Sequence, residues 1–205
     1  MKLFLENKEG VNQLAMAIKK RVLAHRELYS NAIKAELWEE VLHRSFADIG
    51  ITTDWQPDGN HGVGKDMTLA TGERISCKSG SYDNKGTLTI SGSRLTKHKT
   101  LQEKISFISD KKEDSYALLS RHKNDKRGAE YKLILFPSDI LNYGELDWKI
   151  KKTKPKKNSG LTSQPSGFEA SSSLLICSIQ KNMSDQLWTK IRNFEDCTEI
   201  VHHTI

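Results

Sequence analysis

Apolar residues recur at helical spacing in two stretches near the start of the chain. The first stretch runs from Val11 to Leu28 and the second from Asn31 to Phe46. In both, the apolar positions return every three to four residues, which places them on one face of a helix. In the second stretch, Ser30 or Asn31 stands where an N-cap is expected. The pattern therefore predicts two amphipathic helices.

Later in the chain, apolar and polar residues alternate as they do in strands. Met67 and Leu69 alternate with polar neighbours, and Ile75 and Cys77 do so after the turn residues Thr71-Gly72. This predicts two short strands joined by a tight turn. Further strands are predicted over 87–91, 116–120, 131–136 and 174–179, and further helices over 101–108, 138–143 and from Ser184 to Trp188. We expect an α/β fold with a mixed central β-sheet flanked by helices.

The composition is typical of one soluble domain with a basic surface. A chain of 205 residues can bury a sizeable core in a single domain. Its 32 Lys and Arg exceed its 26 Asp and Glu, and the resulting net charge of +6 favours a polyanionic partner. The three cysteines lie far apart, so they form neither a zinc motif nor a disulfide framework. We expect no signal peptide and no membrane span, and a cytoplasmic location.

The predicted hairpin, over about residues 65–80, has an acid at its start and a lysine at its end. Residues two apart on a strand share a face, so Ser76 and Lys78 lie on one side and Cys77 on the other. We therefore expect Lys78 beside Ser76, on the face that looks toward Asp66. An aspartate across a hairpin from a lysine can hold a hard cation and stabilise charge that develops on a phosphate. These residues favour phosphodiester hydrolysis.

The hairpin resembles the active site of the PD-(D/E)xK nucleases, the family that contains many type II restriction endonucleases. The resemblance covers roughly Ala35 to Lys99 and implies a restriction-endonuclease-like core. It also implies that Asp66 binds the metal ion and that Lys78 contacts the scissile phosphate or the attacking water. Ser76 stands where the family has a second acid, and a hydroxyl is a poorer Mg²⁺ ligand than a carboxylate. Either the second carboxylate comes from elsewhere, or there is no metal site.

The helix before the hairpin offers candidates for that carboxylate. Related nucleases often carry a glutamate on this helix, frequently as Gly-x-x-aromatic-Glu, and Ala35-Glu-Leu-Trp-Glu39 resembles the pattern. Glu39 is the first choice and Glu36, one turn earlier, is the reserve, while Glu40 is also open. We expect the backbone carbonyl of Cys77 to assist the metal and Ser76 to hydrogen-bond a metal-bound water. The alternative for the glutamates is a solvated helix face.

A second aspartate competes with Asp66 for the metal role. Pro57-Asp58 also precedes the tripeptide, but the Gly-rich residues that follow it, including His61, are typical of a flexible loop. Asp66 runs directly into the alternating strand pattern. We therefore prefer Asp66 and expect His61 to be an exposed loop residue.

Two segments have the composition of a DNA contact. In the first, small residues permit close backbone approach and basic side chains supply donors to phosphates or to a guanine edge. We expect DNA contacts from Ser91, Ser93, Arg94, Lys97, His98 and Lys99, with a ligand-free basic loop as the alternative. The second, 149–160, is the densest basic run, and either attracts phosphates or serves as a linker. We expect Trp188 in the core rather than stacked on a base.

Together, these features predict Mg²⁺-dependent, sequence-specific cleavage of double-stranded DNA, as in a type II restriction endonuclease of a bacterial cell. Cutting both strands of a short palindrome would call for a homodimer. One alternative is a structure-selective repair or recombination nuclease with the same fold. The other is a DNA-binding protein without chemistry, in which Ser76 marks a decayed site.

Overall fold

The computed structural model of the protein describes residues 4, 6–56, 66–110, 113–126, 130–152, 165–181 and 184–205. Within these residues, the chain forms a mixed α/β fold around a ten-stranded sheet, as expected at this level. The α-helices are α2 (Lys8–Leu28), α3 (Ala35–Asp48) and α4 (Leu101–Ser109). The strands are β1 (Met67–Thr68), β2 (Arg74–Tyr82), β3 (Leu88–Arg94), β4 (Ser115–His122), β5 (Tyr131–Pro137), β6 (Lys149–Lys152), β7 (Pro165–Ser171), β8 (Leu175–Gln180), β9 (Gln186–Ile191) and β10 (Val201–Thr204).

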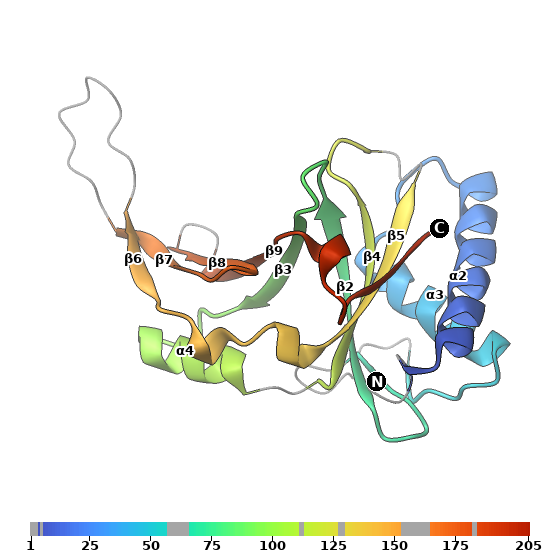
Figure 1. Ribbon diagram of the computed structural model, residues 1–205, viewed down its shortest axis with the longest axis horizontal. Coiled ribbons are helices and arrows are strands. Elements are labelled where there is room, and N and C mark those ends of the chain that lie inside the picture. The colour runs from blue at the N-terminus through green and yellow to red at the C-terminus, as the bar shows by residue number, and fades with distance from the viewer. Residues whose placement is uncertain are drawn as a thin grey trace.

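The strands follow the order β10-β5-β4-β2-β3-β9-β8-β7-β6, with β1 paired to β2 outside this path. The β2–β4 pair is parallel, and the other pairs between these strands are antiparallel. The parallel pair requires a crossover, which β3 and α4 provide between β2 and β4. Figure 1 shows α2 and α3 beside β2, β4 and β5, and α4 below the strands from β3 to β6.

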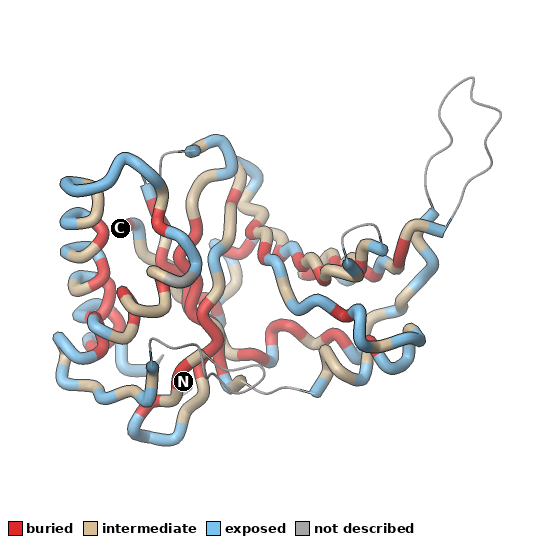
Figure 2. The backbone as a smooth tube through the Cα atoms, turned by 180° about the vertical axis from the view of Figure 1, so that it is seen from behind, coloured by how far each residue is buried: buried red, intermediate tan, exposed pale blue. Residues whose placement is uncertain are grey.

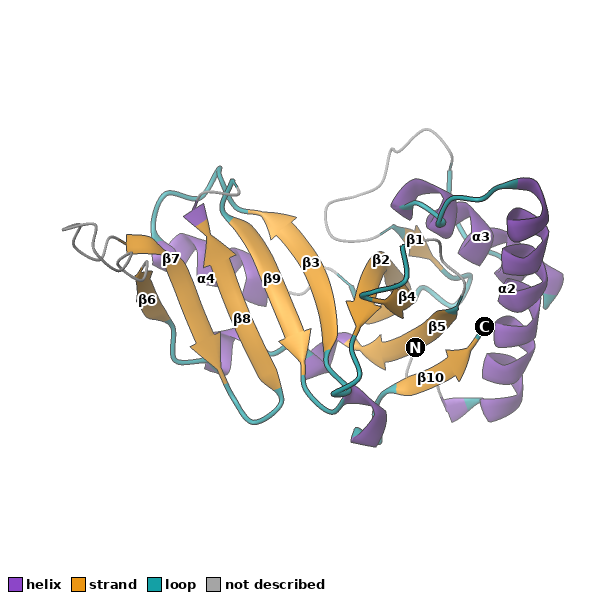
Figure 3. Ribbon diagram, turned by 90° about the horizontal axis from the view of Figure 1, so that it is seen from above, coloured by secondary structure: helices purple, strands orange, loops and turns teal. Residues whose placement is uncertain are grey.

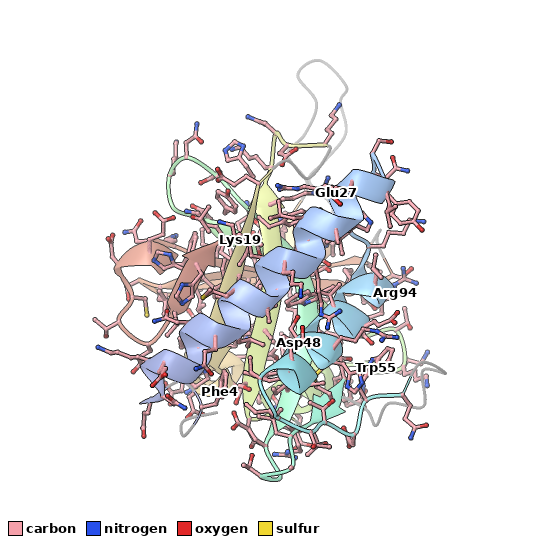
Figure 4. The ribbon with its side chains drawn as sticks, turned by 90° about the vertical axis from the view of Figure 1, so that its right-hand side faces the viewer. Phe4, Lys19, Glu27, Asp48, Trp55 and Arg94 are labelled. Carbon is pink, nitrogen blue, oxygen red and sulfur yellow. The ribbon has the colours of Figure 1, made fainter. Side chains whose placement is uncertain are left out.

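The sheet has a separate hydrophobic core on each of its faces. On one face, Ile75 and Cys77 pack with Trp38 and other residues of α2 and α3. On the other face, Leu118 packs with residues of β3, β8 and β9, and Phe107 of α4 lies against this second core. Figure 2 shows the buried residues gathered in the strands and on the inner side of α2, and Figure 4 shows α2 crossing in front of the sheet. Along β2, successive side chains therefore point to opposite faces of the sheet.

Strands β2 and β3 stay together over only part of their length. Their pairing runs from Tyr82↔Leu88 to Gly80↔Ile90. Nearer its start, β2 pairs instead with β1, in the register Met67↔Ile75. From Gly80 back toward the start of β2, the two strands are therefore no longer paired. The predicted catalytic residues Ser76 and Lys78 lie in this part of β2.

Several sequence predictions are wrong in detail. Helix α3 begins at Ala35 rather than Asn31, and its N-cap is Lys34, which makes no side-chain capping bond. The preceding residues are not helical: Ile33 is buried, and its amide donates a 2.8 Å hydrogen bond to Tyr131 Oη. Strand β3 runs on to Arg94, where a loop was expected.

The segment predicted as a last helix is strand β9. Ser184 and Asp185 take left-handed backbone angles, with φ of 57° and 49°, so they form a turn rather than a helix start. From there, Leu187, Thr189 and Ile191 are buried in alternation, which is the period of a strand. Trp188, expected in the core, is only partly buried. Strands β6, β7 and β10 were not predicted.

Candidate functional site

Three donors at the start of β2 converge on one carboxylate oxygen. Oδ2 of Asp66 accepts hydrogen bonds from the Cys77 amide at 2.5 Å, from Ser76 Oγ at 3.1 Å and from Lys78 Nζ at 3.2 Å. The Lys78 and Asp66 side chains form an ion pair and are 32% and 17% exposed. The structure thus has the geometry that strand parity predicted, with Ser76 and Lys78 turned toward Asp66.

The local fold explains why Asp66 reaches these groups. Its amide donates a 2.9 Å hydrogen bond to the Ile75 carbonyl, which fixes the start of the first strand against the second. The turn between the strands places Gly72 at a φ of +87°, a conformation that costs glycine little. The Gly72 amide donates to the Leu69 carbonyl at 2.8 Å and closes the turn. The hairpin therefore holds Asp66 opposite Cys77.

Cys77 presents its backbone, rather than its thiol, to Asp66. In an antiparallel ladder, the N–H and the C=O of one residue face the same neighbour. Because the Cys77 amide donates to Asp66, its carbonyl also lies on this edge of β2, as its expected role as a metal ligand requires. Burial raises the pKa of the Cys77 thiol well above its usual range, and the negative charges of Asp66 and Glu39 raise it further. The thiol therefore stays neutral at physiological pH.

Helix α3 brings Glu39 to the level of Cys77. Trp38 is fully buried, and its Nε1 donates a 3.2 Å hydrogen bond to the carbonyl of Ala117, the register partner of Cys77. The residue after Trp38 is the partly buried Glu39, whose charge acts on the Cys77 thiol. Glu39 thus lies near enough to β2 for its charge to act on the Cys77 thiol, and its role as the second carboxylate stays a prediction.

The other two glutamates of this helix differ from Glu39. Glu40 accepts a 2.7 Å hydrogen bond from Arg44 Nε, an exposed i,i+4 ion pair of the kind found on solvated helix faces. The side chain of Glu36 lies outside the described part of the structure. Glu40 thus fits the alternative interpretation of a solvated acid.

A cavity of about 160 Å³ adjoins the Asp66 cluster. Residues of the hairpin, of β3, of the segment before β4 and of the α4 side of β9 line this cavity. The lining residues are Asp66, Ser76, Lys78, Ile90, Ser91, Gly92, Ser93, Phe107, Ile108, Asp110, Glu113, Tyr116, Leu141, Tyr143, Leu187 and Thr189. The site is therefore a polar recess where β2 and β3 separate, with apolar walls.

Sequence reasoning missed two acids and a phenol in this cavity. Asp110 and Glu113 were not among the candidate residues, and Tyr116 was predicted only as part of a strand over 116–120. Glu113 accepts a hydrogen bond from Tyr116 Oη, and Tyr116 is the register partner of Ser76 across the parallel β2–β4 pair. Burial raises the pKa of Tyr116, and the nearby Tyr143, Glu113 and Asp66 add to this. Only the strand order, which the sequence does not disclose, brings these groups together.

The oxygen donors near the hairpin suit a hard cation. Carboxylates and backbone carbonyls are the ligands that Mg²⁺ takes in proteins, and Asp66, Glu39 and the Cys77 carbonyl are all of this type. Within the described residues, no group of three or more His, Cys, Asp or Glu side chains is arranged to hold a metal ion. Asp66 and the Cys77 backbone are the oxygen-bearing groups that the described structure places side by side.

The residues expected to bind DNA occupy different surroundings. Ser91 and Ser93 line the cavity, and Arg94, Lys97 and Lys99 are exposed. His98 packs its ring against Phe107 of α4 at a centroid distance of 4.5 Å, and its carbonyl accepts a hydrogen bond from Lys104. His98 is thus partly covered by α4, and its contact with DNA stays a prediction. Pro57-Asp58, His61 and the segment 153–160 lie outside the described residues.

The comparisons with known proteins identify no family. The chain matches no protein-family model, and it has no match among the curated proteins. Of the helices in the described ranges, none has the length and apolar character to cross a membrane.

Proposed function

We propose that the protein is a Mg²⁺-dependent endonuclease that cuts double-stranded DNA at specific sequences, as type II restriction endonucleases do. The observation that carries this proposal is the convergence of Ser76, Lys78 and the Cys77 backbone on Asp66. An acid, a lysine and a carbonyl at one strand edge are the protein groups that phosphodiester hydrolysis needs beside a metal ion.

Each residue has a distinct part in the proposed reaction. Asp66, Glu39 and the Cys77 carbonyl would hold the metal ion, which supplies positive charge for the phosphate and a more acidic water when bound. The Ser76 hydroxyl donates a hydrogen bond to Asp66 and so keeps the Asp66 carboxylate turned toward β2. Lys78 would donate to the attacking water and to a phosphate oxygen. The water oxygen bonds to phosphorus and gives up a proton, while the bond from phosphorus to the 3′ oxygen breaks. The products are a 5′-phosphate and a 3′-hydroxyl, whose oxygen takes up a proton as it leaves.

A DNA-binding protein without catalytic activity is the second candidate. The observation in its favour is Ser76, because a hydroxyl at the position of the second acid removes one negative charge from the site. In this case, the Lys78–Asp66 ion pair would be the resting state of a site that never receives a metal ion.

Plasmid digestion separates these functions. Supercoiled plasmid is incubated with the protein in Mg²⁺, with EDTA in a parallel reaction, and the products are resolved on a gel. Discrete fragments that need Mg²⁺ support the restriction-type activity, and mapping their ends gives the recognition site. Cutting confined to branched or damaged DNA would favour a structure-selective nuclease. Binding without nicking in any metal ion would reject catalysis.

A further inference from the structure

One face of the sheet half formed by β3, β9, β8, β7 and β6 has no described helix packed on it. Figure 3 shows β3, β9, β8 and β7 in front, with α4 behind them. Strand β9 shows the contrast between the two faces. Leu187, Thr189 and Ile191 are buried on the α4 side, whereas Trp188 is partly buried and Lys190 is exposed on the other side. We call this second side the open face.

The strand register shows which residues share the open face with Trp188. Trp188 lies between Ser178 of β8 and Ser91 of β3. The same row continues through Glu169 of β7 to Lys149 of β6. The neighbouring row reads Lys151, Gly167, Gln180, Gln186 and Arg94. It lies two residues away along β6 to β9, and three residues away along β3, where the register shifts between Ser91 and Arg94. Apart from Trp188, the side chains in these two rows are polar or charged.

Positive charges lie at both margins of the open face. Lys149 and Lys151 occupy β6, while Arg94 and Lys190 occupy β3 and β9. Among the residues of these rows, Glu169 is the acid, and its Oε2 lies 3.8 Å from Lys151 Nζ. Lys149 also has an acidic neighbour, with 2.9 Å between its Nζ and Asp147 Oδ2. Such exposed pairs are weak, so both lysines can exchange them for phosphates.

The distance between the two margins suits a DNA duplex. Neighbouring strands are about 4.8 Å apart, so β6 is roughly 14 Å from β9 and 19 Å from β3. The major groove of B-DNA is about 12 Å wide between its phosphate backbones. The long lysine and arginine side chains can bridge the difference of a few ångströms between the groove width and the distance that separates the two margins. Two cationic margins at this separation match the two backbones that border one groove, a pattern that an acidic peptide does not have.

The open face connects to the candidate active site. A hollow of about 520 Å³ lies between the open face and the start of α3, and its lining includes Ser79, Thr89, Arg121 and Trp188. Ser91 lines both this hollow and the cavity that contains Asp66 and Lys78. The side chains of Ser76 and Lys78 project on the α4 side of the sheet, as Ile90 and Leu187 do in the same cavity. A nucleic-acid strand on the open face would therefore approach them from the opposite side of the sheet, past Ser91, where β2 and β3 separate.

We propose that the open face is the surface on which double-stranded DNA lies, with Lys149 and Lys151 contacting one phosphate backbone and Arg94 and Lys190 the other. This inference rests on the proposed function for the identity of the ligand, and it extends that function by naming the docking surface. Trp188, between the two margins, faces the groove.

Fluorescence anisotropy with a labelled duplex of about two helical turns tests the proposal. The titrations are made in EDTA, so that binding is measured without cleavage, and at several salt concentrations. The variants are Lys149→Gln/Lys151→Gln and Arg94→Gln/Lys190→Gln, and the matched control is Lys19→Gln/Lys20→Gln on the outer side of α2, where Figure 4 labels Lys19. Thermal unfolding checks that each variant folds as the wild type does.

We expect each open-face double variant to lose at least tenfold in affinity. The slope of log affinity against log salt should also fall by about 2, because each lost phosphate contact contributes about 0.9. The control should keep both values. If both open-face variants keep the wild-type affinity and the wild-type salt slope, the proposal is overturned. It is also overturned if the wild-type protein binds polyglutamate but no duplex.

Plasmid cleavage by the same proteins distinguishes the two proposals. Normal cutting by open-face variants that also bind normally rejects the docking surface and leaves the nuclease activity standing. Loss of duplex binding by the variants, with no cutting by the wild type, supports the docking surface and rejects the nuclease activity.

Discussion

Lys78 Nζ lies 3.2 Å from Oδ2 of Asp66, at the point where β2 separates from β3. Both side chains keep some contact with solvent, and ion pairs of this kind add little to folding stability. The pair is therefore not needed to hold the fold together, which agrees with the catalytic role that we propose for it.

Replacing either member of this pair should remove cleavage without unfolding the protein. We expect Asp66→Ala and Lys78→Ala to reduce plasmid cutting at least about a hundredfold, because each removes a charge that acts on the phosphate or the metal ion. Duplex binding in EDTA should stay largely intact. The control is Lys123→Ala, which breaks the exposed 3.3 Å pair with Asp83 and should cut normally. Cutting at the wild-type rate by either hairpin variant contradicts the site assignment.

Two adjacent glutamates of α3 can be used to test which residue supplies the second carboxylate that the hairpin lacks at Ser76. Glu39→Gln should lower the cutting rate and raise the Mg²⁺ concentration needed for half-maximal activity, since a ligand charge is lost. Glu40→Gln removes only the exposed pair with Arg44 and should leave both quantities unchanged. A Mg²⁺ titration of the initial rate provides both values. Equal effects of the two substitutions would show that Glu39 is not a ligand.

The anchor of α3 can be tested through its indole. Trp38→Phe removes the hydrogen bond from Nε1 to the Ala117 carbonyl, at a cost of about 0.5–1.5 kcal/mol in the free energy of unfolding. Cutting should fall as well, because the helix then holds Glu39 less firmly. Trp55→Phe is the matched control, since within the described structure the Trp55 Nε1 has no hydrogen-bond partner. Urea unfolding gives both stabilities, and an unfolding midpoint of Trp38→Phe no lower than that of the control would argue against the anchor.

The hairpin could be predicted because local rules govern it. Alternation and the Thr71-Gly72 turn place Ser76 and Lys78 on one face opposite Asp66 without reference to any other element. The helices α2 and α4 follow from periodicity for the same reason.

The rest of the site depends on strand order, which local patterns do not determine. Glu113 and Tyr116 reach the cavity because β4 pairs in parallel with β2 after a crossover. Ser184 was predicted to cap a helix. The segment after it is a strand instead, because Leu187 and Thr189 are both buried on the side of the sheet that α4 covers. The open face around Trp188 was likewise invisible in the sequence, because it exists only once five strands lie side by side.

The close packing of β2 against β4 predicts a compensating pair of substitutions. A Cβ atom added at Gly80 would lie 2.5 Å from Ser120 Oγ, so Gly80→Ala should cost about 1–3 kcal/mol. Within the described structure, the buried Ser120 hydroxyl has no hydrogen-bond partner, so Ser120→Ala should be neutral or stabilising. The double variant should recover most of the lost stability. Additive effects in a double-mutant cycle by urea unfolding would contradict this contact.

The buried thiols predict a loss of stability at alkaline pH. Burial raises the pKa of Cys177 to about 11 and that of Cys77 well above 9.0, the ordinary value for a thiol. Between pH 9 and 10, these thiols ionise in the unfolded chain but keep their protons in the folded protein. Unfolding therefore releases protons in this window, and the free energy of unfolding should fall as the pH rises.

The reactivity of the three thiols tests the same burial directly. At pH 8, the partly exposed Cys197 should react with a thiol reagent while Cys77 and Cys177 react only on unfolding. A Cys197→Ser protein should then show almost no labelling until urea is added. The Cys177→Ala variant should show a shallower fall in stability between pH 9 and 10, because one of the two protons is no longer released. Three thiols that react at equal rates in the folded protein would contradict the packing of Cys77 beneath α3, and with it the position of Glu39 beside the hairpin.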